Sequence, residues 1–392
     1  MRTYRYVILG GGMVAGYAAK ELVERGLGRG ELAIVSSDAV PPYERPPLSK
    51  GFLAGTEAEE SVYINPRPFY DDHGIDLSLA TVVTGIDRQR KRLRTHAGGE
   101  IGFEKLLIAT GAQVRTLDLS GAGLPGIYYL RSLDDAKQIK MATHSARDSA
   151  VIGGGFIAME VASVLAQQGL RPTMIFPGKR VWDRFFTPPI SAFFQQYYEQ
   201  RGVTFAPGEE VAAFVGDGRL TAAGLKSSRQ IPADIVVAGV GVKPATAVLD
   251  GVVSLSNGVV VNEFLETNVA GIYAAGDVAN YRDVLFGKQR RVEHWDNAVE
   301  QGRHAARVML GEREPFVHVP YFFSDVFDLS YEFWGDNEGA GEVVYRGDVT
   351  SRSFSAWWLK EGRVIAALVM NRPDEERELA PKLIQERRPL PG

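Results

Sequence analysis

The stretch that decides the fold is Gly153-Gly154-Gly155-Phe156-Ile157-Ala158-Met159-Glu160. It follows the apolar run Ala150-Val151-Ile152 and opens an apolar-periodic segment that continues to Leu165. A strand, a tight glycine turn and a helix in this order are typical of a dinucleotide-binding fold. The glycines let the backbone approach a pyrophosphate, and the N-terminus of the helix offers N–H groups to its phosphates. One such fingerprint is a weak signal, because an ordinary glycine turn has the same pattern.

The same pattern occurs at the N-terminus, where Tyr6-Val7-Ile8-Leu9 is followed by Gly10-Gly11-Gly12-Met13-Val14. Two matching strand–turn–helix units in one chain argue against coincidence. They predict two dinucleotide sites, one for a flavin dinucleotide that stays bound and one for a nicotinamide dinucleotide that comes and goes. The sequence therefore indicates a flavoenzyme.

Composition excludes several other classes of protein. The net charge of −4 gives no general attraction to nucleic acid or to an anionic membrane. No apolar run is long enough to span a bilayer, and the N-terminus reads directly into a strand rather than a signal peptide. We therefore expect a cytoplasmic protein with no nucleic-acid partner and no membrane span.

The chain contains no cysteine. Flavin enzymes that reduce disulfides pass electrons to a redox-active cysteine pair, so this chemistry is not available here. Thiolate metal sites are excluded as well. Because the six His residues show no metal-ligand spacing, we predict that the protein holds no metal.

Candidate ligand contacts follow the first glycine turn. A second strand, Leu32-Ala33-Ile34-Val35, leads to Asp38, the one acid placed to hold a ribose, although a loop Asp that caps a turn would look the same. The prolines predict that 41–50 is a rigid, non-helical loop. It can hold Arg45 and Lys50 near a pyrophosphate or a reduced flavin, or it is a surface turn with two solvated cations. We expect a further strand around 76–83.

The second dinucleotide unit continues to a strand at Thr173-Met174-Ile175-Phe176, which ends at Pro177-Gly178-Lys179-Arg180. An acid at this end would bind an unphosphorylated ribose, but here a glycine and two cations follow. Lys179 and Arg180 can bind a 2′-phosphate, which favours NADPH with NADH tolerated. Surface cations without this role remain the alternative.

Later segments complete the predicted fold. Leu106-Leu107-Ile108 ends on the small residues Ala109, Thr110 and Gly111, and Asp277 follows another buried strand, where its carboxylate can accept from a flavin ribityl hydroxyl. A helical pattern covers 291–310, and short aromatic and β-branched runs after Gly311 indicate antiparallel strands, a candidate surface for pairing two subunits. The predicted class is α/β, with two Rossmann-like dinucleotide-binding domains and a C-terminal α+β domain with an antiparallel sheet. The predicted domains are 1–113 with 243–312 for FAD, 114–242 for NAD(P)H, and 313–392 as an interface domain.

Several motifs in order resemble one family. They are the two fingerprints, the Pro42-Tyr43-Glu44-Arg45-Pro46-Pro47-Leu48-Ser49-Lys50 loop, Ala109-Thr110-Gly111, Ala275-Gly276-Asp277, Arg291-Val292-Glu293-His294 and Pro320-Tyr321-Phe322-Phe323-Ser324-Asp325. The chain resembles the FAD-dependent pyridine nucleotide oxidoreductases, a family that includes monodehydroascorbate reductase, oxygenase-type ferredoxin reductases and apoptosis-inducing factor. The resemblance covers essentially the whole chain.

The resemblance implies non-covalent FAD, NADPH or NADH as hydride donor, and a set of binding residues. Lys50 and Glu160 match the ion pair that the family places beside the flavin ring, and they are the expected catalytic residues. The resemblance places FAD against Gly11, Gly12, Met13, Val14, Asp38, Arg45, Lys50, Val83, Arg131, Asp277 and Trp295. It places NAD(P)H against Gly154, Gly155, Phe156, Ile157, Glu160, Arg184, Gly241, Glu293 and His294. Further expected cofactor-binding residues are Gly10, Ala109, Thr110, Gly111, Gly153 and Phe323, together with Lys179 and Arg180 at the strand end.

The electron acceptor is the least determined partner. Plant monodehydroascorbate reductases present arginines to the acceptor at positions that are Val299 and Asp325 here, whereas Ser324-Asp325 and Trp295 resemble the ferredoxin-reductase branch. We expect electrons to pass from NAD(P)H through FAD to a one-electron carrier of the ferredoxin type. The alternatives are a monodehydroascorbate- or quinone-type small-molecule reductase and a redox-sensing flavoprotein like apoptosis-inducing factor. The cations Lys288, Arg290, Arg291, Arg303 and Arg307 either steer an acidic carrier or line a solvated helix face.

Overall fold

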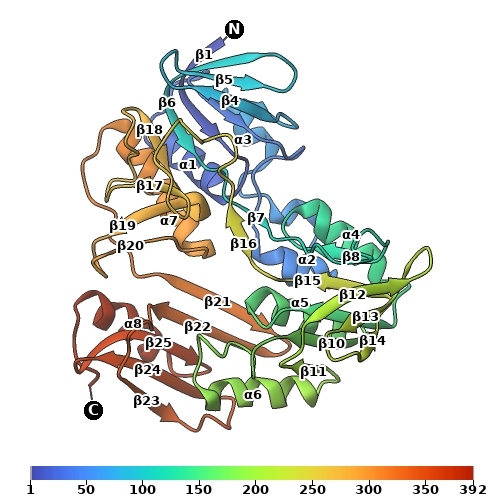
Figure 1. Ribbon diagram of the computed structural model, residues 1–392. Coiled ribbons are helices and arrows are strands. Elements are labelled where there is room, and N and C mark those ends of the chain that lie inside the picture. The colour runs from blue at the N-terminus through green and yellow to red at the C-terminus, as the bar shows by residue number, and fades with distance from the viewer. Residues whose placement is uncertain (1, 392) are drawn as a thin grey trace. The chain divides into compact units, whose positions relative to one another are not determined.

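The computed structural model describes residues 2–391, and its chain groups into two compact units (Figure 1). The first unit consists of Met1–Glu44, Glu59–Gln113 and Lys243–Pro320. The second unit consists of Arg45–Ala58, Val114–Val242 and Tyr321–Gly392. Parallel sheets with helices occur in both units, which confirms the predicted α/β class. The three-domain division expected from the sequence stays a prediction.

The first unit is built on a seven-stranded sheet in the order β3-β2-β1-β6-β5-β4, with β18 also paired to β6. Strands β1, β2, β3, β6 and β18 are parallel, whereas β4 and β5 add an antiparallel edge. The strands are β1 (Arg2–Leu9), β2 (Leu32–Val35), β3 (Asp76–Ser78), β4 (Val83–Asp87), β5 (Arg92–Thr95), β6 (Glu100–Ile108) and β18 (Ile272–Ala274).

Two helices of the first unit pack closely against each other, α1 (Met13–Glu24) and α7 (Trp295–Leu310). A side chain at Gly302 on α7 would place its Cβ 2.9 Å from the Val14 carbonyl oxygen on α1, so glycine is required for this approach. The smaller elements are η2 (Glu59–Val62), α3 (Arg67–Asp72), η3 (Gly276–Val278) and the sheet of β17 (Val259–Val261), β19 (Ala279–Asp283) and β20 (Lys288–Arg290).

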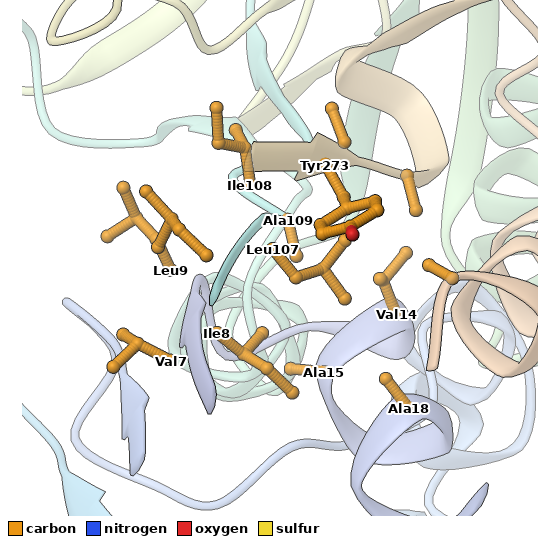
Figure 2. Close-up of a cluster of buried hydrophobic side chains, with 14 of the residues drawn as sticks. Val7, Ile8, Leu9, Val14, Ala15, Ala18, Leu107, Ile108, Ala109 and Tyr273 are labelled. Carbon is orange, nitrogen blue, oxygen red and sulfur yellow. The ribbon is translucent and has the colours of Figure 1, made fainter. Parts of the chain in front are cut away.

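Figure 2 shows a cluster of buried hydrophobic side chains contributed by β1, β6, β18 and α1. Ile8 of β1 and Leu107 of β6 lie beside Ala15 and Ala18 of α1, and each of these residues is fully buried. The alanines allow the helix to lie close to the sheet, while the branched side chains fill the space between the strands. Burial of apolar surface at about 25 cal/mol per Å² thus holds the N-terminus of α1 against the ends of the strands.

The second unit contains an all-parallel sheet in the order β11-β10-β9-β15-β8 and a three-stranded antiparallel sheet, β12-β13-β14. The parallel strands are β8 (Ile127–Tyr129), β9 (Asp148–Ile152), β10 (Arg171–Phe176), β11 (Thr204–Pro207) and β15 (Ile235–Ala238). The antiparallel strands are β12 (Val211–Gly216), β13 (Leu220–Leu225) and β14 (Gln230–Pro232). The helices are η1 (Pro46–Ser49), α2 (Gly51–Ala54), α4 (Leu133–Thr143), α5 (Phe156–Gln167) and α6 (Pro188–Glu199).

The predicted C-terminal sheet is present in the second unit. It is antiparallel throughout, in the order β21-β22-β25-β24-β23, and α8 (Asp374–Gln385) packs on β25. Its strands are β21 (Tyr321–Val326), β22 (Leu329–Gly335), β23 (Glu342–Gly347), β24 (Phe354–Lys360) and β25 (Arg363–Met370). The remaining pair, β7 (Ala112–Val114) with β16 (Val242–Pro244), lies where the chain changes units.

Three expectations need correction. The segment 76–83 is not one strand, because Ala80 adopts a φ of +47° and separates β3 from β4. The helix expected over 291–310 begins at Trp295, with His294 as its extended N-cap. The loop 41–50 is not wholly non-helical, because η1 starts at Pro46, where the fixed φ of proline suits a first helical turn.

Replacing Gly10 by Ala should lower the free energy of unfolding by more than the usual cost of placing alanine at a positive φ. Gly10 has a φ of +127°, and a Cβ there would lie 2.1 Å from the Ala109 carbonyl oxygen. Gly26 is the matched control, because its φ is +87° and a Cβ would meet nothing within 4 Å. Gly26→Ala should cost about 1 kcal/mol in urea unfolding, and Gly10→Ala clearly more. Equal losses would show that backbone crowding at the turn is unimportant.

Acid should destabilise the first unit through His304. Burial, with the charge of Arg307 adding, lowers the pKa of His304 from 6.5 to about 4. Between these values the unfolded chain binds a proton that the folded chain does not, so stability falls as the pH decreases from about 6.5 to about 4. The slope from this group is about 1.4 kcal/mol per pH unit.

The check is urea unfolding across this pH range for the wild type, His304→Asn and His96→Asn. The His304 variant should lose stability less steeply than the wild type, whereas the variant of the exposed His96 should follow the wild type. Parallel curves for the wild type and His304→Asn would remove His304 from the acid response.

Candidate functional site

The first glycine turn is pressed between the ends of two strands. A Cβ on Gly10 would collide with the Ala109 carbonyl after β6, and a Cβ on Gly11 would lie 2.2 Å from Ser36 Oγ after β2. Only glycine fits these two positions. The turn therefore sits at the point of the sheet where the strand order reverses, which is where open α/β sheets bind their ligands.

Helix α1 begins at this turn with its N-terminal donors uncapped. Its N-cap is Gly12, no side chain makes a cap hydrogen bond, and the first turn contains no acid. The free N–H groups and the partial positive charge of this end suit a phosphate. The residues present thus fit the pyrophosphate of a dinucleotide.

The second glycine turn repeats this construction in the second unit. A Cβ on Gly153, whose φ is +128°, would lie 2.4 Å from the Gly239 carbonyl oxygen, whereas Gly155 faces open space. Helix α5 begins there with no side-chain cap and no acid in its first turn. Helix α4 of the same unit has a capping box formed by Ser132 and Asp135, whereas α6 also begins without a side-chain cap. The start of α5 is therefore marked by the glycine turn and the uncapped end together, not by the missing cap alone.

Other residues expected around FAD lie on loops and strand ends of the first unit. Asp38 is half-buried after β2, and Tyr43 donates to its Oδ2 at 3.1 Å. Val83 is buried at the start of β4, and Thr110 Oγ1 donates to the Ala245 carbonyl at 2.8 Å. Asp277 lies in η3, and its carbonyl accepts from Arg291 Nη1 at 3.0 Å.

Trp295, the first residue of α7, is fixed by a carboxylate that the sequence did not single out. Glu44 accepts a hydrogen bond from Trp295 Nε1 on one oxygen and from the Tyr17 hydroxyl, at 2.6 Å, on the other. Glu293 and His294 immediately precede this tryptophan, and Glu293 pairs with Arg291. The indole orientation is therefore set by Glu44, which is held in turn by Tyr17 of α1.

Lys50 and Glu160 form the expected ion pair. Lys50 Nζ lies 2.6 Å from Glu160 Oε1, and the side chains are 15% and 5% exposed. Ser49 Oγ donates to Oε2 at 2.5 Å, and Ser324 Oγ donates to Oε1 at 2.6 Å. A buried carboxylate is tolerated only when it is paired and hydrogen-bonded, and Glu160 satisfies both conditions.

Three further expected residues lie on the segments that carry this pair or contact those segments. Lys50 Nζ is 5.5 Å from the centre of the Phe323 ring, within cation–π range. Arg45 Nη1 donates to the Arg131 carbonyl, which ties the proline-rich loop to the residue just before the cap of α4. Segments of the second unit that contact one another therefore carry five of the expected residues, namely Arg45, Lys50, Arg131, Glu160 and Phe323.

Phe156 at the start of α5 belongs to an aromatic cluster. Its ring centroid lies 4.6 Å from that of Phe322 and 5.4 Å from those of Trp182 and Phe185. The next residue, Ile157, is 47% exposed, which is unusual for a large apolar side chain within a helix. The start of α5 therefore combines a fixed aromatic ring with an open apolar surface.

The loop after β10 carries the residues expected at the adenosine ribose. Lys179 and Arg184 are exposed, whereas Arg180 is half-buried and donates from Nη2 to the Asp183 carbonyl at 3.1 Å. Gly241, which follows β15, is exposed with a φ of +90°. Of the three cations, Arg180 is thus the one engaged with the backbone of its own loop.

The basic rim suggested by the sequence is largely neutralised. Arg290 pairs with Asp283 at 2.7 Å, Arg303 with Glu300 at 3.2 Å, and Arg307 with Glu21 at 3.3 Å. Arg291 pairs with Glu293. Paired cations contribute little long-range field, so this rim gives no support to electrostatic steering.

Sequence reasoning missed Ser49, Ser324, Glu44 and Asp183 as parts of these arrangements. Ser324 had a usable signal, because it alternates with the exposed Asp325 along a strand and so faces the buried side. Ser49 ends the short helix η1, and Glu44 and Asp183 lie in loops and turns, so no periodicity indicates the direction of these side chains.

Comparison with known proteins assigns the family. Residues 4–302 match the family model of the pyridine nucleotide-disulphide oxidoreductases, and residues 321–391 match the reductase C-terminal domain. The chain belongs to this family. It is an FAD-dependent NAD(P)H oxidoreductase. Because it has no cysteine, the disulfide chemistry in the family's name is not available to this member.

Relatives and solved structures cover nearly the whole chain. Peroxisomal monodehydroascorbate reductase 4 of Arabidopsis thaliana is 37% identical, covering 98% of this chain and 83% of that protein. The monodehydroascorbate reductase of Pisum sativum is 36% identical, covering 97% and 94%. The ferredoxin reductase for the CYP199A2 system from Rhodopseudomonas palustris has a TM-score of 0.94 and 32% identity over 98% and 96%. The covalent putidaredoxin reductase–putidaredoxin complex gives 0.94 and 31% over 98% and 94%.

Two absences hold for the described residues. Within 2–391, no three or more His, Cys, Asp or Glu side chains gather in a way that could hold a metal ion. None of the helices found in this range has the length and apolarity required to cross a membrane.

Ser324→Ala should destabilise the second unit by about 2 kcal/mol, because it removes a hydrogen bond to a buried charged group. The matched control is Ser149→Ala, since Ser149 is fully buried and its Oγ has no hydrogen-bond partner. The control should stay within about 0.5 kcal/mol of the wild type in urea unfolding. A Ser324 variant as stable as the control would mean that this bond does not contribute to the support of Glu160.

Proposed function

We propose that this oxidoreductase passes electrons from NAD(P)H through FAD to a one-electron protein carrier of the ferredoxin type. The observation that carries the proposal is the chemistry at two positions. Val299 is apolar and only 4% exposed, and Asp325 is an exposed carboxylate. Neither can bind the ascorbyl radical anion as the arginines of plant monodehydroascorbate reductases do. Two solved structures with a TM-score of 0.94 are named as reductases of ferredoxin-type systems, which supports the proposal.

In this proposal the first unit holds FAD and the second unit binds NAD(P)H. The glycine turn at Gly10–Gly12 and the N-terminus of α1 bind the pyrophosphate of FAD, and Asp38 accepts hydrogen bonds from its ribose. Asp277 accepts from the ribityl chain. The turn at Gly153–Gly155 binds the pyrophosphate of NAD(P)H at the N-terminus of α5. Further contacts are assigned to Met13, Val14, Arg45, Val83, Ala109, Thr110, Gly111, Arg131, Phe156, Ile157, Lys179, Arg180, Arg184, Gly241, Glu293, His294, Trp295 and Phe323.

Bound FAD supplies the chemistry of accepting a hydride from the nicotinamide and releasing electrons singly. Lys50 places a positive charge where negative charge develops on the reduced ring, and Glu160 holds Lys50 in place. The two serine hydroxyls keep the Glu160 carboxylate oriented. With this arrangement, charge stabilisation needs no rearrangement of the protein during the reaction.

A small-molecule reductase is the second candidate function. It is favoured by the sequence identity of 37% to a monodehydroascorbate reductase, which exceeds the 32% to a ferredoxin reductase.

A redox-sensing flavoprotein is the third candidate function. Such a protein would show slow reoxidation by every acceptor and a dimer that forms only on reduction. The homodimer and the cytoplasmic location stay predictions from the sequence.

The acceptor is identified by steady-state assays of the purified flavoprotein with a ferredoxin, the ascorbyl radical and a quinone as alternative acceptors. The proposal expects the highest kcat/KM with the ferredoxin. A clear preference for the ascorbyl radical or the quinone would show that the protein is instead a small-molecule reductase.

Lys50→Met should slow flavin reduction by NAD(P)H by at least about tenfold. The variant lacks the positive charge that stabilises the developing negative charge in the transition state, and a loss of about 1.4 kcal/mol of this stabilisation corresponds to tenfold in rate. The measurement is the decay of oxidised flavin absorbance in a stopped-flow instrument. Lys226→Met is the control, since Lys226 forms an exposed pair with Glu210 on the same unit. If Lys50→Met reduces its flavin as fast as the control, Lys50 has no role in hydride transfer.

A further inference from the structure

No acidic residue follows β10 directly in the sequence, but the fold brings one, Asp183, to the end of this strand. A side chain at Gly178 would place its Cβ 2.8 Å from Asp183 Oδ2 and 3.0 Å from Asp183 Cγ. The Asp183 carboxylate therefore occupies the volume into which a side chain at position 178 would extend. Glycine at 178 leaves the room that this carboxylate needs.

The loop that carries Asp183 folds back onto the second glycine turn. The backbone N–H of Trp182 donates to the Gly154 carbonyl at 3.1 Å, and Trp182 adopts a φ of +52°. Asp183 is the next residue. Its carboxylate lies beside Gly178 at the end of the second strand of this fold, and the backbone of its neighbour Trp182 contacts the glycine turn. Dinucleotide folds hold the adenosine ribose at this strand end.

The carboxylate is available to a ligand. Asp183 is half-buried, and its side chain makes no hydrogen bond or ion pair with any other residue in the range 2–391. Arg180 does not neutralise it, because the Arg180 Nη2 donates to the Asp183 backbone carbonyl and its Nε is buried without a partner.

We propose that Asp183 accepts hydrogen bonds from the adenosine ribose hydroxyls and makes this chain prefer NADH to NADPH. The proposal rests on the proposed binding of NAD(P)H by the second unit. It opposes the preference for NADPH that Gly178-Lys179-Arg180 suggest when they are read along the chain. The acid expected at the strand end is supplied from five residues further on.

Relative magnitudes favour the carboxylate over the cations. A hydrogen bond to a charged group is among the stronger polar contacts, and a 2′-phosphate would bring a second anion against Asp183. Lys179 and Arg184 are exposed, and exposed ion pairs contribute little to binding because water screens them. Their attraction for a 2′-phosphate is therefore too weak to offset the repulsion.

The test is calorimetric titration of the flavin-loaded protein with ADP-ribose and with 2′-phospho-ADP-ribose. The wild type should bind ADP-ribose at least about tenfold more tightly, the effect of one hydrogen bond to a charged group. Asp183→Asn should weaken ADP-ribose about tenfold and strengthen the phosphorylated ligand, and the ratio of kcat/KM for NADH and NADPH should fall accordingly. Asp217→Asn removes the same charge from an exposed loop of this unit and should change neither Kd.

Two results would overturn the proposal: a wild type that binds the phosphorylated ligand more tightly, or an Asp183 variant with an unchanged ratio of the two Kd values. Lys179→Ala provides an independent arm, because a marked weakening of the phosphorylated ligand alone would assign specificity to the cation, and an unchanged ratio of the two Kd values supports Asp183. Neither ligand contains a nicotinamide, so the titration is independent of electron transfer. If the protein reduces no ferredoxin, the proposed acceptor is wrong, but the proposed role of Asp183 at the ribose is unaffected.

Discussion

The second unit depends on the compensation of one buried charge. Glu160 projects from α5, and its carboxylate is held by Lys50, Ser49 and Ser324, which come from the proline-rich loop and from the C-terminal sheet. Taking a carboxylate out of water costs several kcal/mol unless every lone pair finds a partner. The fold therefore cannot place α5 without also placing residues that lie far away in the sequence. This requirement explains why the segment Arg45–Ala58 groups with the second unit although the neighbouring chain belongs to the first.

Both glycine turns obey a second constraint, the crowding of backbone against backbone. Gly10 lies against the carbonyl that follows β6, and Gly153 lies against the carbonyl that follows β15. The same solution, reached twice in one chain, puts an uncapped helix N-terminus beside a strand end in each unit. Because neither helix begins with an acidic first turn, both ends keep their attraction for anions.

Much of the fold could be predicted from sequence, because glycine turns between apolar runs constrain the backbone locally. The strand Leu32–Val35 and both fingerprint helices were located in this way, and so was the C-terminal antiparallel sheet. The pairing of Lys50 with Glu160 followed from family resemblance. Asp183 and Glu44 could not be found, since their roles arise from loops that return to distant elements. A linear pattern records which residue follows a strand, but it does not record which residue a loop brings back to that strand.

The uncapped starts of α1 and α5 differ from a capped helix start in what satisfies their N–H donors. A helix end capped by its own side chains, such as that of α4, is complete as soon as the chain folds. An end that leaves its donors to a dinucleotide is complete only in the presence of that ligand, so binding adds to the free energy of folding by mass action. In the proposed assignment, in which the start of α1 binds FAD, this links the stability of newly made protein to the supply of flavin at the time of synthesis.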